Sequence, residues 1–294
     1  MMNLVSLLLN ILLDGVAYAM ILFMISVGLS ISLGLMRVVN MAHGAFAMLG
    51  GYITIAVMNQ MKVPFEVAVI AAIVATAIIS IPLETFLIRK VYGRNELDQA
   101  LLTIGIAFVV IAGVNSVTGA NISVIKLPYY LNGSIDLGFR SLPTDRLVVI
   151  VLGLVVTVAL WFFVERSAFG VKLRAAVDNA AMAEAVKINT SRLYVISFAL
   201  GAALAALGGI AGASLLPMEP TYALKYLVLF LAVVAVGGHG TLFGSFLAAV
   251  ILGIIDTATK YLAPEYSSIA FFATMLIVLA VRPQGLLGAN GAKS

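Results

Sequence analysis

The sequence predicts an all-α protein: a polytopic helical bundle embedded in a membrane. Sixty-three per cent of its 294 residues are hydrophobic and 10% are charged, whereas a soluble domain carries about 25% charged residues. The mean hydropathy of +1.14 leaves too little polar surface to cover a core in water. The apolar stretches do not alternate over about ten residues, as the strands of a membrane barrel do. Their length is typical of membrane-spanning helices.

Charge-free runs mark the expected helices in order. They cover residues 15–36, 38–61, 67–83, 99–125, 147–164, 193–218, 226–255 and 266–281. These runs leave little room for a domain outside the membrane, so residues 1–294 are expected to form a single transmembrane domain. No basic stretch and no small-residue cleavage site accompany the first apolar segment, which favours a retained helix over a signal peptide.

The run at 226–255 is too long for one simple helix and contains the stretch GGHGTLFGS at 237–245. Non-helical backbone survives at membrane depth only where protein or a water-filled cavity surrounds it. The run therefore either turns on the cytoplasmic side or re-enters the bundle. We expect eight or nine transmembrane segments, with this glycine-broken segment in the interior or at its inner rim.

Basic residues predict the orientation. If the runs alternate across the membrane, one side collects eleven of the seventeen Lys and Arg residues: Arg37, Arg89, Lys90, Arg94, Arg166, Lys172, Arg174, Lys187, Arg192, Arg282 and Lys293. Basic residues concentrate in cytoplasmic loops. The N-terminus is therefore expected outside and the C-terminus inside.

The stretch VVNMAHGAFAMLGG at 38–51 sets polar and small residues in an apolar context. Asn40 and His43 need partners, because an unsatisfied polar group in hydrocarbon costs several kcal/mol. Gly44, Gly50 and Gly51 allow helices to approach closely. Two interpretations stay open from these residues alone. One is a broken helix that lines a solute path. The other is a short cytoplasmic turn followed by a helix with a glycine packing face, the commoner use of small residues in membrane helices.

The main cytoplasmic loop, residues 166–192, is expected to contain a helix within residues 172–188. It is rich in alanine and has neither proline nor, after Gly170, glycine, a composition that favours helix. Asn189, Thr190 or Ser191 can cap the helix that follows. A helix on the cytoplasmic face is a docking element for another protein, although a solvated connector has the same kind of composition.

Enzyme chemistry is disfavoured. The sequence has no Gly-Lys pair for a phosphate-binding loop and neither a GxSxG nor an HExxH motif. With no cysteine and two histidines, we expect no metal site and no cofactor. An ion-coupled secondary carrier or channel that acts alone is the alternative function. Such a carrier needs ionisable residues at mid-membrane, whereas Asp14, Glu84 and Asp256 lie near the ends of runs.

Four motifs in order resemble one permease family. They are RVVNMAHGAFAMLGGYI, GVKLRAAVDNAAMAEAVKINTSRL with FALGAALAALGG, VAVGGHGTLFGS, and RPQGLLG. Nearly the whole chain resembles the LivH-type permeases, the membrane subunits of ABC importers for branched-chain amino acids and related small solutes. The resemblance implies a bacterial inner-membrane protein. It also implies a second, LivM-like permease, two cytoplasmic ABC ATPase subunits and an extracytoplasmic solute-binding protein as partners.

The resemblance also implies roles for residues. Both glycine-broken segments are expected to shape the translocation path, through Asn40, His43, Gly44, Gly50, Gly51, Gly237, Gly238, His239, Gly240 and Gly244. The loop at 166–192 matches the coupling segment of the family, with the candidate ATPase contacts Arg174, Ala175, Asn179, Ala183 and Glu184. Lys187 stands where the family usually has glycine, which puts the local bend in doubt. The solute is not specified, since close relatives carry urea, short amides or aromatic acids.

Overall fold

A computed structural model describes residues 4–36, 38–119, 121–136, 141–238 and 240–288. Helices dominate this part of the chain, as the sequence predicts. The helices of the bundle are α1 (Leu4–Leu35), α2 (His43–Met61), α3 (Phe65–Phe86), α4 (Glu96–Thr118), α5 (Thr144–Trp161), α8 (Thr190–Ala211), α10 (Leu227–Gly237), α11 (Leu242–Leu262) and α12 (Ser267–Val281). The helical segments in the connections between them are η1 (Ile88–Val91), η2 (Phe162–Arg166), α6 (Ala168–Asp178), α7 (Ala180–Ala185), α9 (Tyr222–Lys225) and η3 (Pro264–Tyr266).

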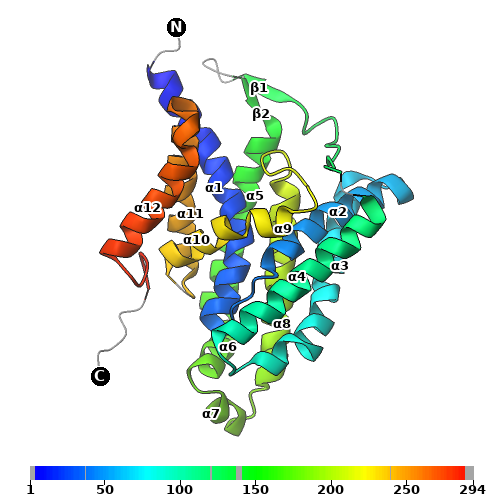
Figure 1. Ribbon diagram of the computed structural model, residues 1–294, viewed down its shortest axis with the longest axis vertical. Coiled ribbons are helices and arrows are strands. Elements are labelled where there is room, and N and C mark those ends of the chain that lie inside the picture. Colours follow the sequence, from blue (N-terminus) through cyan, green and yellow to red (C-terminus); the bar gives the residue numbers. More distant parts are fainter. Residues whose placement is uncertain (1–3, 37, 120, 137–140, 239, 289–294) are drawn as a thin grey trace.

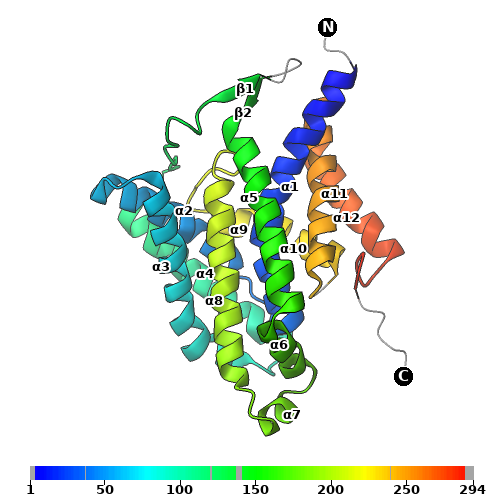
Figure 2. The ribbon, with the colours of Figure 1, turned by 180° about the vertical axis from the view of Figure 1, so that it is seen from behind.

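Helix α1 is the centre of the bundle. In its most apolar 18-residue window 89% of the residues are buried, against 22% in α3 and α4. Helices α11 and α12 lie on one flank of α1, and α2, α3 and α4 lie on the other (Figure 1). From behind, α8 lies between α3 and α5 (Figure 2). The outer helices therefore expose apolar faces, as expected where lipid or a partner chain replaces water.

The two ends of the bundle differ. A two-stranded antiparallel hairpin, β1 (Ser134–Asp136) and β2 (Ser141–Pro143), pairs Ile135 with Leu142. It lies at the top of Figure 1 with the start of α1, whereas α7 lies at the bottom. We call these the hairpin end and the α7 end. The hairpin is a small departure from the expected all-α chain, and it belongs to the connection between α4 and α5.

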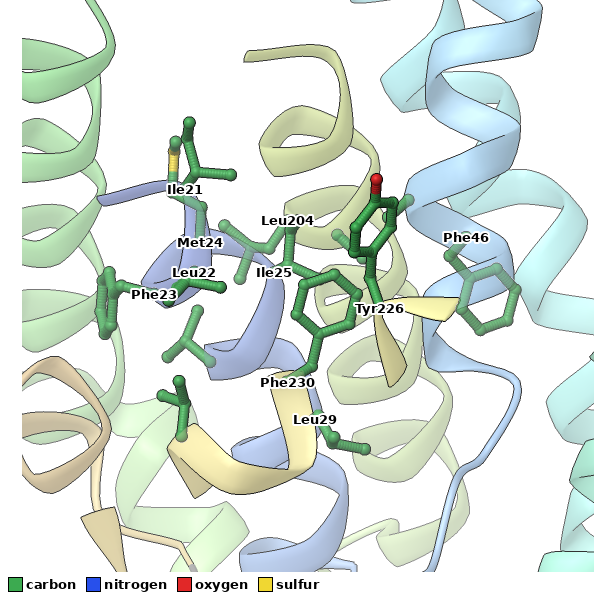
Figure 3. Packing of buried hydrophobic residues seen from close by; sticks show 14 of the residues in the cluster. Ile21, Leu22, Phe23, Met24, Ile25, Leu29, Phe46, Leu204, Tyr226 and Phe230 are labelled. Atoms are coloured by element: carbon green, nitrogen blue, oxygen red, sulfur yellow. The ribbon is translucent and has the colours of Figure 1, made fainter. Parts of the chain in front are cut away.

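The densest packing surrounds the middle of α1. Figure 3 shows Ile25 and Leu29 of α1 beside Phe230 of α10 and Leu204 of α8. Phe230 is fully buried, as are Phe23 and Phe46. Two long helices and one short one thus share a single hydrophobic core.

Seven helices are long and apolar enough to cross a membrane within the described ranges. Helix α2 is 19 residues long but contains His43, Asn59, Gln60 and three glycines, and α10 has only 11 residues. The expected break in the run at 226–255 is confirmed, because α10 ends at Gly237 and α11 begins at Leu242. Whether the crossings number eight or nine stays a prediction.

Buried carboxylates are paired near the ends of helices. The side chain of Glu84 is 0% exposed and accepts from Arg89 Nη2 at 2.9 Å and from the Tyr92 hydroxyl at 2.9 Å. Burial, and then the negative charge of Glu84, raises the pKa of Tyr92 in the turn that follows α3. The phenol therefore stays protonated and donates. At the hairpin end, Asp14 of α1 contacts Arg146 of α5 and Tyr261 of α11, which ties three helices together.

Replacing Arg89 with methionine should lower the free energy of unfolding by about 3 kcal/mol or more, because Glu84 would be left as a buried, uncompensated charge. The matched control is Arg94→Met, since Arg94 lies 4.0 Å from the exposed Asp98 and such surface pairs contribute about 1 kcal/mol or less. Denaturant titration of both variants in detergent micelles measures the difference. Equal midpoints would show that the Glu84 cluster does not stabilise the fold.

Candidate functional site

The chain leaves α1 and re-enters the bundle before α2 begins. His43 Nε2 lies 2.7 Å from the carbonyl oxygen of Ile25, and Ile25 precedes the end of α1 at Leu35 by ten residues. At 1.5 Å per helical residue, α2 therefore begins about 15 Å back from the end of α1. Figure 1 shows this extended connection inside the bundle. A short turn directly after α1 is therefore wrong, because the chain runs back along α1 before α2 begins. The position of this connection relative to the membrane stays a prediction.

Side chains of α4 satisfy the backbone of this connection. Gln99 Oε1 accepts from the N–H of Val39 at 2.8 Å, and Thr103 Oγ1 accepts from the N–H of Met41 at 3.0 Å. Gln99 and Thr103 are buried and stand four residues apart, on one face of α4. Both were missed as site residues, although two polar side chains with helical spacing in an apolar run are the signal that identifies them.

Asn40 lies just before α2, and His43 is the first residue of this helix. Both are almost fully buried. Asn40 Oδ1 accepts from the N–H of Ala42 at 3.1 Å. The histidine ring stands edge-on to Phe46, 6.3 Å away between ring centres. The hydrogen bond between the His43 ring and the Ile25 carbonyl connects the start of α2 to α1.

The glycines of α2 mark contacts with backbone and with Met218. A Cβ on Gly44 would lie 2.3 Å from the carbonyl oxygen of Ala223 in α9, and one on Gly50 would lie 2.6 Å from the Cα of Ala206 in α8. A Cβ on Gly51 would meet the sulfur of Met218 at 2.3 Å. At Gly44 and Gly50 the close atoms are backbone, so no side chain fits there and close helix approach is confirmed; at Gly51 the close atoms belong to the flexible side chain of Met218. These residues are packed against their own chain, and a role in lining the path stays a prediction.

The second glycine segment joins the end of α10 to the turn after α12. Gly238 has φ +94° and Gly240 has φ +77°, a region that favours glycine. A Cβ on Gly238 would lie 2.6 Å from the backbone N of Gly288, and one on Gly240 would lie 2.8 Å from the Cα of Gly34 in α1. A Cβ on Gly244 would lie 2.1 Å from the carbonyl oxygen of Gly237. The segment therefore connects α10 to α11 and packs closely against the end of α1.

The C-terminal turn also supplies hydrogen bonds to α10. The N–H groups of Leu286 and Leu287 donate to the carbonyl oxygens of Val236 at 2.7 Å and Gly237 at 3.2 Å. The last carbonyls of a helix have no partner within it, so the turn caps α10 from outside. His239, also expected in this segment, lies outside the described residues.

The loop at 166–192 holds two helices, so the single helix expected within 172–188 is wrong. Helix α6 ends at Asp178 and α7 begins at Ala180. Asn179 adopts φ −153° and its side chain accepts from the N–H of Met182 at 3.0 Å. Capping by asparagine competes with helix continuation, which overrides the alanine-rich composition. Asn189 caps α8 by accepting from the N–H of Arg192 at 2.9 Å, as expected.

The other candidate contacts differ in exposure. Arg174 donates to the Val164 carbonyl at 2.8 Å, and Glu184 accepts from the Thr190 hydroxyl at 2.5 Å. Ala175 is half-buried, and Ala183 is buried against Leu173, Ala176 and Leu193. These residues hold the two helices in place, and among the five candidates Asn179 and Glu184 are exposed.

The chain still bends at Lys187, where the family usually has glycine. Its φ is +62°, a conformation that lysine adopts at a cost of about 1 kcal/mol. Its N–H donates to the Glu184 carbonyl at 2.9 Å, and the N–H of Ile188 donates to the Ala183 carbonyl at 3.0 Å. The bend is fixed by these helix-terminal hydrogen bonds and does not require glycine.

Comparisons with known proteins identify relatives. Residues 11–279 match the family model described as branched-chain amino acid transport system / permease component. The high-affinity branched-chain amino acid transport system permease protein LivH of Escherichia coli (strain K12) is 28% identical over 291 residues, which covers 94% of each chain. BraD of Pseudomonas aeruginosa, named as a permease protein of the same kind of system, is 25% identical over 293 residues and 94% of each chain. The solved structure of PsaBC from Streptococcus pneumoniae in complex with Fab aligns with 95% of this chain and 91% of that one, at 14% identity and a TM-score of 0.48.

Thr103→Val tests the support of the connection. Valine keeps the shape but leaves the N–H of Met41 without its acceptor, which should cost about 1–3 kcal/mol. The control is Thr274→Val, because within the described part of the chain the Thr274 hydroxyl donates only to the Ala270 carbonyl of its own helix, and a change of about 0.5 kcal/mol or less is expected. Unfolding midpoints in detergent measure both. A Thr103 variant as stable as its control would mean that Met41 is satisfied in another way.

Proposed function

Because this chain belongs to the family of permease components of branched-chain amino acid transport systems, we propose that it moves a branched-chain amino acid through the membrane within an ATP-driven, binding-protein-dependent importer. The protein is a multi-pass permease subunit of the inner membrane. The match over residues 11–279 carries this proposal.

Two interrupted elements meet inside the bundle and support a path there. Helix α2 starts in the interior, and Gly44 in its first turn touches the backbone of Ala223 in α9. Helix α9 leads into α10, which has 11 residues and ends at Gly237, the start of the second glycine segment. Transporters commonly build solute sites from discontinuous helices near mid-membrane. The junction of α2 with α9 and α10 is therefore the proposed position of the path beside the partner permease.

A carrier that acts alone is less well supported. Asp14 contacts Arg146, Glu84 contacts Arg89, and Asp256 lies 2.5 Å from Lys260. Each pair is near the end of a helix, so these carboxylates are engaged as structural ion pairs. A proton- or ion-coupled carrier needs an ionisable group free to change its charge along the path.

The α6–α7 element is the proposed docking site for an ATPase subunit. It lies at the α7 end, where α6 follows the end of α5 beside the start of α8 and α7 lies beyond both (Figure 2). Val171, Met182 and Val186 are 58%, 64% and 65% exposed, although the segment is too polar to lie in hydrocarbon. Exposed apolar side chains on a small helical element are typical of a protein interface. We further propose that the importer has two ATPase subunits on this side of the membrane and a LivM-like permease beside this chain. A solute-binding protein would dock at the hairpin end.

Transport should depend on the close packing of α2. In proteoliposomes with the partner subunits and ATP, Gly50→Leu is expected to abolish uptake of labelled L-leucine while the protein still inserts, since overpacking a tight contact costs about 1–3 kcal/mol or more. The control is Gly105→Leu, because a Cβ at Gly105 would meet, among the described residues, no atom within 4 Å beyond the backbone of its own helix. Uptake by Gly50→Leu equal to that of the parent would contradict the role of α2. Competition by urea, short amides or aromatic acids in the parent identifies the solute.

Coupling should depend on the exposed apolar residues of α7. Combining Met182→Glu with Val186→Glu should reduce ATP-driven uptake on the order of tenfold, as loss of an interface anchor does, and leave membrane insertion intact. This pair is a cleaner test than exchanging Arg174 and Glu184, which bond within the element. Lys62→Glu, at the hairpin end, is the control. Normal coupling in the double variant would place the ATPase elsewhere.

The proposed orientation has the hairpin end outside and the α7 end inside. The chain contains no cysteine, so single cysteines report position without background. Ser134→Cys in β1 should react with an impermeant maleimide added to intact cells, and Asn179→Cys should react only after the membrane is opened. Both residues are exposed. Labelling of Asn179→Cys in intact cells would reverse the orientation.

A further inference from the structure

A cavity of about 640 Å³ lies at the hairpin end of the bundle. It is half open and is bordered by the start of α3, the start of α5, the end of α8 and the connecting segment at 124–132. Its wall is mainly apolar and includes Phe65, Val69, Val149, Leu152, Leu207 and Ile210. This volume falls within the range of roughly 300–1,000 Å³ that is typical of small-molecule sites.

Two opposite charges line this apolar cavity. Lys126 and Asp145 both contribute to its wall, yet neither forms a hydrogen bond or an ion pair with any residue that the structure describes. Lys126 is exposed and Asp145 is half-buried. Water can solvate both groups in the empty cavity, and a ligand that covers them must supply polar partners, because a buried charge without a partner is costly. The two groups are therefore available to a ligand that supplies both partners.

Hydrogen bonds hold the lysine segment in place. On one side of Lys126, the N–H of Ser123 donates to the Met218 carbonyl at 2.8 Å. On the other side, Asn132 Nδ2 donates to the Leu127 carbonyl at 2.8 Å. Asp145 is set in the first turn of α5. Both charges therefore extend from anchored backbone.

We propose that this cavity is a transient site for a free apolar α-amino acid. The solute carboxylate pairs with Lys126, its ammonium group pairs with Asp145, and its branched side chain contacts the apolar wall. An anion or a cation alone would leave one wall charge uncompensated, and a charged side chain would meet hydrocarbon. The proposal rests on the proposed function and adds to it a site at the hairpin end. Helix α8 connects the two regions, since its Leu207 lines the cavity while its Ala206 packs on α2.

Equilibrium binding of radiolabelled L-leucine to the purified full-length chain in phosphatidylcholine nanodiscs tests this site. Lys126→Met and Asp145→Asn should each weaken binding about tenfold or more, because each removes a bond to a charged group. A double variant, Lys126→Asp with Asp145→Lys, should recover part of the binding by accepting the zwitterion in reverse. Lys62→Met and Glu66→Gln change exposed charges at the same end of the bundle and should bind like the parent.

Analogues distinguish the two charges. Isoamylamine lacks the carboxylate and 4-methylpentanoate lacks the ammonium group, so both should compete at least about tenfold less well than L-leucine. L-Glutamate should not compete. Equal binding by the parent and both single variants would overturn the proposal. So would occupancy by added phosphatidylethanolamine that L-leucine does not displace, which would make the cavity a lipid site.

Binding of L-leucine to the chain and uptake of L-leucine by the assembled importer test the cavity and the proposed function separately. If the assembled importer takes up L-leucine with ATP but the chain binds none, the cavity proposal is wrong and the permease function stands. If neither uptake nor binding occurs, the proposed function is wrong as well. Binding with the expected dependence on Lys126 and Asp145 supports the site.

Discussion

Hydrocarbon offers no hydrogen-bond partners, so every backbone N–H and C=O at membrane depth must be satisfied within the protein. This requirement governs the region where α1 gives way to α2. The chain turns back into the bundle without helical structure, and Gln99, Thr103 and Asn40 accept its N–H groups. At the other break, Leu286 and Leu287 donate to the last carbonyls of α10. Both interruptions are stable because other segments complete their hydrogen bonds.

The glycine packing follows from the same requirement. A backbone break in the interior needs neighbouring backbone close by, and side chains would hold that backbone away. Gly44 and Gly50 allow α2 to meet α9 and α8, and Gly28 allows α1 to meet Gly201 of α8. Glycines with open surroundings, such as Gly105 and Gly113 of α4, face away from this core. Glycine therefore marks contact in the centre of the bundle, where the proposed path lies.

Much of this architecture could be predicted from the sequence. Composition and run length identify a helical membrane protein, GGHGTLFGS locates the break after α10, and Asn189 caps α8 as its position indicates. The depth at which α2 begins could not be predicted, because a turn at the surface and a turn in the interior use the same residues. Asn179 divides the loop at 166–192 into two helices through a side-chain cap that composition alone does not predict. Lys126 and Asp145 line the same cavity because the fold brings together segments that lie apart in the sequence.

The most direct test of this account is amide hydrogen exchange, measured by mass spectrometry on the protein in nanodiscs. Peptides covering residues 36–45 should exchange slowly, at rates close to those of α1, because buried side chains accept their N–H groups. Peptides covering the exposed stretch at 129–136 should exchange much faster, since protection follows burial and hydrogen bonding. Fast exchange throughout residues 36–45 would contradict the account, because it would place the start of α2 in contact with water.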